Sequence, residues 1–341
     1  MDFQPTEQPI IEVAYQHREN NRIRCDICPQ HCKLGEGGIG VCGGKQVIDD
    51  KLIAVNYAQV SSLHLDPIEK KPLFHFFPGC DILSVGPTGC NLSCKWCQNW
   101  NISQNQAPTR TILPNELADM VDALDGIGVA YTYAEPLIWY EYIRDAGKIL
   151  HERDLVNVVI SNGYINEKPL KDILPFTDAF NIDLKSSDDY CYQNHCGGRL
   201  SDVQRTIRMV FDSGRHLEIT HLIVTGVGDE LSKIEKLTSW IASVDSKIPL
   251  HLSRYFPSHK YNEPPTDLEV MRKAYEVARE KLDWVYLGNS EKNVLQDSHC
   301  PTCNNLLVNR HNFEANLVGL DGNRCANCHA KLNFHFELVS A

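Results

Sequence analysis

The chain has 341 residues, enough for one large domain with a smaller unit or for two ordinary domains. Hydrophobic residues make up 43% and charged residues 23% of it, which excludes a disordered composition, and the net charge of −11 argues against general binding of nucleic acid or anionic membranes. No apolar run approaches the roughly 18 residues of a membrane span. The acidic N-terminus lacks the pattern of a signal peptide, so we expect a cytoplasmic protein.

Fourteen cysteines are the most informative feature of the composition. In a reducing compartment, clustered cysteines indicate metal ligands or redox groups rather than a disulfide framework. Cys191 and Cys196 stand apart in a loop and are candidate substrate-contacting or redox thiols, with ordinary loop cysteines as the alternative. The others form three groups: Cys25, Cys28, Cys32 and Cys42; Cys90, Cys94 and Cys97, with Cys80 nearby; and Cys300, Cys303, Cys325 and Cys328.

The chain divides into three parts. Residues 1–77 carry many glycines with little periodicity and predict a cysteine-rich N-terminal module. Residues 78–290 alternate apolar runs with helical patterns, which favours parallel strands with helical crossovers, and residues 291–341 form a small cysteine-bearing tail. In chain order we expect a strand at 82–86, a helix at 115–125, a strand at 127–133, a helix at 136–154, a strand at 156–162, a helix at 167–174, a strand at 178–185, a helix at 201–214, a strand at 216–224, a helix at 229–244, a strand at 248–255, a helix at 268–282 and a strand at 284–288.

The fold class that follows is α/β, a partial (β/α)6-type barrel with a small cysteine-rich N-terminal module and a zinc-ribbon-like C-terminal module. Six or seven strands over about 210 residues suit an incomplete barrel better than a full eightfold barrel of roughly 250 residues. A doubly wound open sheet is the alternative.

The middle cysteine group lies in the stretch GPTGCNLSCKWCQNW, where Cys90, Cys94 and Cys97 have the spacing C-x3-C-x2-C. Three closely spaced thiolates suit three corners of a cubane 4Fe-4S cluster, whose fourth iron is then free to bind a small molecule. The loop follows the first barrel strand at its carboxyl end, where such folds place their active sites. The alternative is a zinc loop completed by Cys80 or a histidine.

At these residues the chain resembles the radical S-adenosylmethionine (SAM) superfamily. YAEP (133–136) is similar to the Gly-Gly-Glu-Pro segment that holds the methionine amino group of SAM, although Tyr and Ala replace the two glycines. SNG (161–163) and DLK (183–185) resemble segments of pyruvate formate-lyase activating enzymes, and YLGN (286–289) occupies the place where the last strand passes the adenine. The stretches DPIEKKPLFHFFPG (66–79) and YTYAEPLIWYEY (131–142), with the flanking cysteine groups, resemble the radical SAM enzyme of the AmmeMemoRadiSam system over essentially the whole chain.

The resemblance implies a function. The open iron would chelate the amino and carboxylate groups of SAM, and one electron from the reduced cluster would yield methionine and a 5′-deoxyadenosyl radical that takes hydrogen from an unidentified substrate. It also implies an electron donor such as flavodoxin or ferredoxin and, as a candidate partner, a Memo-like protein. The alternatives are an activase that installs a glycyl radical in a partner enzyme and a non-catalytic, zinc-organised binding protein.

The resemblance and the positions at strand ends make eight residues candidates for contacting SAM. For Glu135 the alternative is a helix-start carboxylate, and Asn162 with Gly163 would also suit an ordinary left-handed turn. Asp183 and Lys185 alternate across Leu184 and share one strand face, where a buried ion pair is costly unless it is functional or well hydrogen-bonded. His221 and His251 lie in predicted strands, where each would either face the barrel lumen or be a core histidine with its hydrogen bonds satisfied. The eight are Glu135, Asn162, Gly163, Asp183, Lys185, His221, His251 and Asn289.

The two flanking cysteine groups predict further metal sites. HCPTC and RCANC give C-x2-C-x21-C-x2-C, the spacing of a four-thiolate zinc ribbon whose closed site is structural, although a rubredoxin-like iron site would use the same ligands. In CDICPQHC, the C-x2-C-x3-C pattern is followed by Cys42. These four thiolates suit structural zinc and, equally, an auxiliary 4Fe-4S cluster with no open site. His31 is an alternative ligand there.

Overall fold

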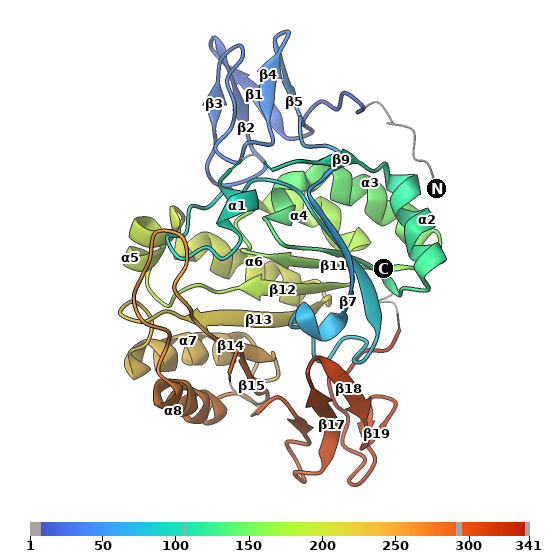
Figure 1. Cartoon of the computed structure of the whole chain (residues 1–341), viewed down its shortest axis with the longest axis vertical. Helices are drawn as coiled ribbons and strands as arrows, with labels where there is room; N and C mark the ends of the chain where they lie inside the picture. The colour runs from blue at the N-terminus through green and yellow to red at the C-terminus, as the bar shows by residue number, and fades with distance from the viewer. Residues whose placement is uncertain (1–7, 106, 291–294, 338–341) are drawn as a thin grey trace.

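The computed structural model describes residues 8–105, 107–290 and 295–337. Its centre is an eight-stranded sheet (Figure 1) in which seven neighbouring strands are parallel and the strand at one edge is antiparallel. In spatial order the strands are β15 (Val285–Gly288), β14 (Leu250–Arg254), β13 (His216–Ile223), β12 (Ala179–Asp183), β11 (Val156–Ser161), β10 (Gly128–Tyr131), β8 (Asp81–Gly86) and the antiparallel β7 (Ser62–Pro67).

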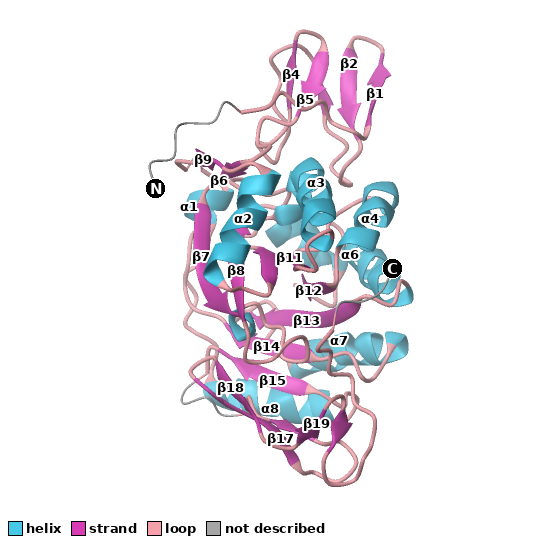
Figure 2. Ribbon diagram, turned by 90° about the vertical axis from the view of Figure 1, so that its right-hand side faces the viewer, coloured by secondary structure: helices cyan, strands magenta, loops and turns pink. Residues whose placement is uncertain are grey.

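One longer helix follows each of the first six parallel strands, and these helices cover one face of the sheet (Figures 1 and 2). Helix α3 (Tyr140–His151) shows why they pack there: Ile143, Ala146 and Leu150 are buried at helical spacing, whereas Lys148 is exposed. The helices are α2 (Pro114–Leu124), α3 (Tyr140–His151), α4 (Glu167–Ile173), α6 (Leu200–Asp212), α7 (Leu231–Val244) and α8 (Leu268–Arg279).

The inner strands are buried on both faces, which is why they read as continuous apolar runs in the sequence. Strand β10 begins at Gly128, which has a φ of 157°. A Cβ atom at this position would lie 2.0 Å from the carbonyl oxygen of Val156 on β11. Glycine therefore permits the close approach of the two strands at this end of the sheet.

The predicted partial barrel is confirmed, and each predicted strand and helix has a counterpart within a few residues. The expected helix at 136–154 opens with a 3-10 turn over Pro136–Trp139 before α3, because the Glu135 side chain accepts a hydrogen bond from the Leu137 N–H and caps that turn. Strand β7 was not predicted. The division at 1–77, 78–290 and 291–341 stays a prediction, and the central sheet itself extends back to Ser62.

The N-terminal module lies at one end of the long axis of the molecule (Figures 1 and 2). A buried ion pair between Lys45 and Glu141 fastens it to the start of α3, and the indole of Trp139 donates a 2.6 Å hydrogen bond to the Asn56 carbonyl. Its strands are β1 (Gln16–Glu19), β2 (Arg22–Cys25), β3 (Lys33–Leu34), β4 (Gln46–Ile48) and β5 (Lys51–Ile53), and nearby β6 (Gln59–Val60) pairs with β9 (Arg110–Thr111).

The C-terminal module lies at the opposite end, beside β15 (Figure 2). It shares an apolar cluster with the barrel, in which Leu307 and Phe334 pack with Phe74, Trp284 and Tyr286. Arg310 is buried there and donates hydrogen bonds to the Phe74 carbonyl (2.7 Å) and to Ser298 Oγ (2.8 Å). The strands are β16 (Ser298–His299), β17 (Leu306–His311), β18 (Glu314–Leu317), β19 (Leu320–Asp321) and β20 (Arg324–Cys325).

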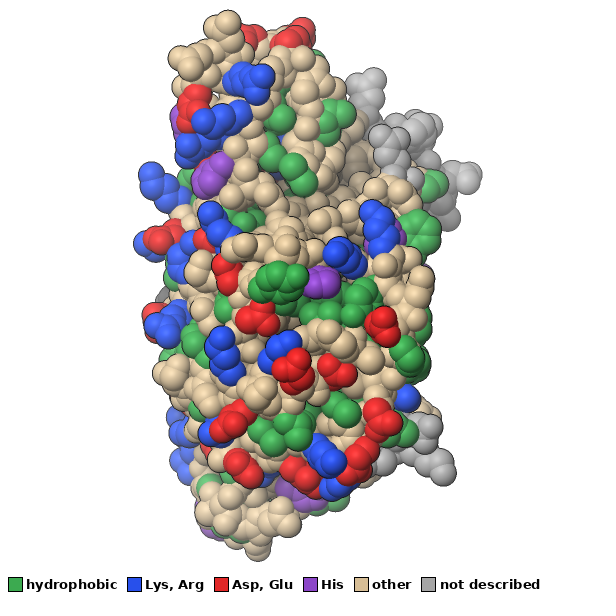
Figure 3. All heavy atoms as spheres, turned by 90° about the vertical axis from the view of Figure 1, so that its left-hand side faces the viewer, with side chains coloured by type: hydrophobic (Ala, Val, Ile, Leu, Met, Phe, Trp, Pro, Cys, Tyr) green, Lys and Arg blue, Asp and Glu red, His purple; other side chains and the backbone are tan. Residues whose placement is uncertain are grey.

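The charged side chains on the surface do not form a single basic patch on the face that is shown in Figure 3. On the face shown in Figure 3, basic and acidic side chains are interspersed. Within the described residues, none of the helices has both the length and the apolar character that crossing a membrane requires.

The docking of the C-terminal module gives a first prediction. Replacing Arg310 by Met should lower the free energy of unfolding by about 2 kcal/mol or more, because the buried Phe74 carbonyl and Ser298 hydroxyl would lose this hydrogen-bond donor. Arg272→Met is the matched control: its ion pairs with Glu269 and Glu276 are exposed, so it should cost less than about 1 kcal/mol. Denaturant unfolding measures both, and equal effects would contradict the assignment.

Candidate active site

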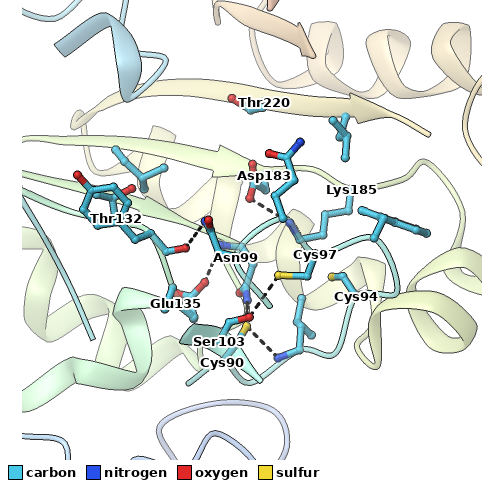
Figure 4. A pocket seen from close by; sticks show the side chains of 18 of the residues that line it. Cys90, Cys94, Cys97, Asn99, Ser103, Thr132, Glu135, Asp183, Lys185 and Thr220 are labelled. Carbon is cyan, nitrogen blue, oxygen red and sulfur yellow. Dashed lines mark hydrogen bonds and ion pairs between the residues drawn. The ribbon is translucent and has the colours of Figure 1, made fainter. Parts of the chain in front are cut away.

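The cysteine loop leaves β8 at its carboxyl end and runs to the short helix α1 (Trp100–Ser103). Its three thiols gather at one side of a cavity of about 380 Å³ (Figure 4). Cys97 Sγ lies 3.2 Å from Ser103 Oγ, and the Leu92 N–H donates to Cys90 Sγ at 3.3 Å. The sulfurs of Cys90, Cys94 and Cys97 do not all lie within 4.8 Å of one another. This spread suits three thiolates that bind three different irons.

Glu135 projects into the same cavity from the segment after β10. Its carboxylate accepts three hydrogen bonds, from the Leu137 N–H (2.9 Å), the Ser161 hydroxyl (2.7 Å) and the Asn162 N–H (2.9 Å). Burial nevertheless raises the pKa of Glu135 to about 7. The side chain is therefore fixed between the ends of β10 and β11, and a cation in the cavity would favour its ionised form.

Asn162 connects the end of β11 with the cysteine loop. Its Nδ2 donates to Asn91 Oδ1 at 2.9 Å and lies 3.6 Å from Cys90 Sγ. Gly163 adopts a φ of 69°, and a Cβ there would meet Ile182 Cγ2 at 2.9 Å instead of the cavity. The structure thus places Asn162 in the site and gives Gly163 the role of a turn former.

Asp183 and Lys185 both line the cavity at the end of β12, as their alternation predicts. Lys185 Nζ lies 3.0 Å from Asp183 Oδ2. Burial lowers the pKa of Lys185, but the Asp183 carboxylate opposes this effect, and the pKa is raised well above its ordinary value. The cavity therefore holds a charged pair beside the thiols. Asn289, directly after β15, lines it too.

The two histidines lie elsewhere. His221 faces the helical layer: its Nδ1 lies 2.8 Å from the Leu184 carbonyl oxygen, and burial lowers its pKa to about 4. Its neighbours Thr220 and Leu222 line the cavity instead, because side chains alternate along a strand. His251 lies 2.6 Å from Glu218 Oε2 and borders a second cavity.

Sequence reasoning missed Tyr133, Asn99, Thr220 and Ser253, which also line the cavity. Tyr133 has a φ of 69°, a conformation that favours glycine, at the position of a glycine in Gly-Gly-Glu-Pro segments. Its hydroxyl donates a 2.8 Å hydrogen bond to Asp66. Asn99 Nδ2 donates to the Tyr133 carbonyl at 2.6 Å. The substitution of that glycine was the signal that this segment has special partners.

A second cavity of about 670 Å³ adjoins the first, between the edge strands β7 and β15 and the C-terminal module. Residues of both cavities include Lys71, Tyr133 and Asn289. Among the described residues around it, Glu69 Oε2 and Ser290 Oγ are buried without a hydrogen-bond partner. Unpaired buried polar atoms of this kind suit contact with a bound molecule.

Of the other cysteines, Cys300, Cys303, Cys325 and Cys328 bring their sulfurs within 4.8 Å of one another, as a tetrahedral metal site requires. Cys25, Cys28, Cys32 and Cys42 line one small cavity in the N-terminal module. Cys191 and Cys196 are buried behind the cysteine loop, where the Ser93 N–H donates to the Cys196 carbonyl at 2.7 Å, and neither lines the main cavity.

Comparisons with known proteins relate this chain to one superfamily. The family model of the radical SAM superfamily matches residues 85–241. The chain is 38% identical over 329 residues to an uncharacterized protein of Methanocaldococcus jannaschii, covering 94% of this chain and 98% of that protein. It is 27% identical over 172 residues to the pyruvate formate-lyase-activating enzyme of Clostridium pasteurianum, covering 49% and 72% of the two chains.

Solved structures show the same fold. A radical SAM methyltransferase from Sphaerobacter thermophilus superposes with a TM-score of 0.50 at 16% identity, over 68% of this chain and 71% of that chain. Streptococcus suis SuiB bound to S-adenosylmethionine gives a TM-score of 0.50 at 14% identity, over 66% and 53%.

The family match, together with the parallel partial barrel and the three-cysteine loop at its carboxyl edge, identifies a radical SAM enzyme. This chain belongs to the radical SAM superfamily and, within it, is similar to pyruvate formate-lyase-activating enzymes. The family match favours an enzyme over the alternative of a non-catalytic, zinc-organised binding protein.

The buried carboxyl of Glu69 gives a prediction of pH dependence. Burial raises its pKa to about 7 from an ordinary 4.5, so its protonated form stabilises the fold. That stability is fully present below pH 4.5 and is lost as the pH rises through about 7. Unfolding free energies of the wild type and Glu69→Gln should therefore diverge by about 2–3 kcal/mol over this range. Glu152→Gln, at an exposed position, is the matched control variant. A Glu69→Gln curve parallel to the wild type would contradict the prediction.

Proposed function

We propose that this protein binds a 4Fe-4S cluster through Cys90, Cys94 and Cys97, cleaves SAM reductively, and uses the resulting 5′-deoxyadenosyl radical to abstract hydrogen from a substrate. The observation that carries the proposal is the convergence of three thiols with Glu135, Asn162, Asp183 and Lys185 on one cavity at the carboxyl ends of the strands. When bound, the cluster supplies an open iron and a one-electron reductant.

The protein side chains would bind and orient SAM. Glu135 is an acceptor for its ammonium group, and the fixed position of the carboxylate keeps that group beside the cysteine loop. Lys185 offers a cation for the carboxylate of SAM, and Asp183 offers an acceptor for ribose hydroxyls. Asn289, directly after the last strand, would contact the adenine of SAM.

The second cavity is the space we assign to the substrate, because it is contiguous with the SAM cavity through Lys71, Tyr133 and Asn289. Reduction of the cluster needs a low-potential donor such as flavodoxin or ferredoxin. A Memo-like protein remains the candidate partner, and the cytoplasm the expected location. The C-terminal thiols would hold zinc in a structural role, since four sulfurs close the coordination sphere.

The second candidate function is activation of a glycyl-radical enzyme. Similarity to pyruvate formate-lyase-activating enzymes supports it, although the similarity to the Clostridium pasteurianum protein covers 49% of this chain. Incubation with candidate partner proteins, followed by electron paramagnetic resonance (EPR) for a glycyl radical, separates the two functions.

The cysteine loop is tested by Cys94→Ala. Loss of one thiolate leaves two protein ligands, so anaerobically reconstituted protein should form 5′-deoxyadenosine from SAM and dithionite at less than a hundredth of the wild-type rate. Cys80→Ala is the control, since Cys80 lies outside the cavity lining and should retain the full rate. Wild-type activity in Cys94→Ala would refute the assignment.

Asp183→Asn and Lys185→Met test the charged pair. Each should weaken SAM binding or slow its cleavage tenfold or more, which corresponds to about 1.4 kcal/mol. Cluster content, measured by iron analysis, should stay normal. Lys273→Met, an exposed lysine on α8, is the control and should leave affinity unchanged. If the pair is only structural, the free energy of unfolding would fall while SAM affinity stays that of the wild type.

A further inference from the structure

The four N-terminal cysteines differ in geometry from the four C-terminal ones. In the C-terminal group, Cys300 Sγ lies 3.6 Å from Cys328 Sγ, and Cys303 Sγ lies 3.6 Å from Cys325 Sγ. Four thiolates around one zinc at about 2.3 Å are separated by about 3.8 Å, so these distances suit a single ion. The C-terminal group thus serves as an internal standard for a one-metal site.

The N-terminal sulfurs are spread more widely. Among the described residues, no three of Cys25, Cys28, Cys32 and Cys42 have sulfurs that all lie within 4.8 Å of one another. All four nevertheless line one common cavity, together with Ile27, Val41 and Ile138. Thiols that surround a hollow instead of a point suit a cubane cluster, in which each thiolate binds a different iron.

The surrounding backbone also suits such a cluster. The Val41 N–H donates to Cys32 Sγ at 3.5 Å, and hydrogen bonds to sulfur are one of the means by which proteins adjust the potential of iron–sulfur clusters. With four cysteines present, each iron would have a protein ligand. This site would therefore have no open iron for SAM, in contrast to the site at Cys90.

The N-terminal cavity lies against the cysteine loop of the active site. A Cβ atom at Gly89 would lie 2.0 Å from the Cys42 carbonyl oxygen, so the two loops are in backbone contact next to Cys90. Asn91, on the other side of Cys90, lines the N-terminal cavity. Its side-chain oxygen accepts a hydrogen bond from Asn162 Nδ2, which also lies 3.6 Å from Cys90 Sγ. The N-terminal module and the cysteine loop are thus in direct contact on both sides of Cys90.

We propose that Cys25, Cys28, Cys32 and Cys42 bind a fully ligated 4Fe-4S cluster that passes electrons to the SAM-binding cluster; the relay rests on the proposed function. A reduced one-electron donor, a flavodoxin or ferredoxin, is oxidised as the N-terminal cluster gains one electron. That cluster is reoxidised as the active-site cluster gains the same electron. No bond forms or breaks and no proton moves in this transfer.

The cluster is tested by metal content. Full-length protein reconstituted with iron and sulfide should contain about eight irons and one zinc per chain. The triple variant Cys90→Ala, Cys94→Ala, Cys97→Ala should retain about four irons, and the EPR signal of its reduced cluster should not change when SAM is added. A triple variant without iron, or a wild type with about four irons and two zincs, would overturn the proposal. This test is independent of whether the protein cleaves SAM.

The relay is tested with Cys32→Ser. With flavodoxin, its reductase and NADPH as the donor system, 5′-deoxyadenosine formation should fall tenfold or more, because the entry cluster is lost. With dithionite, which reduces the active-site cluster directly, the rate should change less than twofold. Equal rates with flavodoxin would overturn the relay. Zinc content serves as the folding control, because a folded variant should keep the C-terminal zinc. If Cys32→Ser loses this zinc, the same assay is done with Cys42→Ser. A wild type inactive with dithionite would refute the proposed function instead.

Discussion

An open parallel sheet leaves two edges, and the rest of this structure depends on how those edges are covered. Exposed strand edges present unpaired backbone groups and invite unwanted pairing. On one side β7 pairs along β8 in antiparallel register from Ser62↔Gly86 to Pro67↔Asp81. On the other side the Leu287 N–H donates to the Leu295 carbonyl, and the Gln296 side chain donates to the Leu287 carbonyl. The sheet therefore does not close into a full barrel, but backbone groups of β8 and β15 find hydrogen-bond partners on their outer sides.

The incomplete closure also explains the position of the C-terminal module. Arg310 reaches across to the Phe74 carbonyl, so the module supports the segment between β7 and β8. The second cavity lies between the edge strands β7 and β15 of the unclosed sheet and the C-terminal module. Among the described residues that line this cavity, Glu69 Oε2 and Ser290 Oγ are buried without a hydrogen-bond partner.

The barrel could be read from the sequence because its strands are buried on both faces and its helices are amphipathic, and both patterns depend on local spacing. Strand β7 was not predicted because its sequence SLHLDP alternates only briefly and only one of its six residues is buried. The cysteine spacings and the shared face of Asp183 and Lys185 were also readable. The place of His221 was not, because which face of a strand looks inward depends on its neighbours; Thr220 and Leu222 take that face. The sequence also left open whether the N-terminal cysteines bind zinc or an iron–sulfur cluster, because the separation of their sulfurs depends on the tertiary structure.

Tyr133 has a consequence for how the two cavities communicate. A left-handed backbone at a bulky residue costs about 1–3 kcal/mol and persists only where neighbours hold it. Here Asp66 binds the hydroxyl, and Lys71 Nζ lies 4.8 Å from the ring centroid. Because the ring borders both cavities, it acts as a partition between them. The two residues that hold Tyr133 in place, Asp66 and Lys71, belong to β7 and to the turn after it, so the boundary between the cavities depends on a part of the chain outside the seven parallel strands.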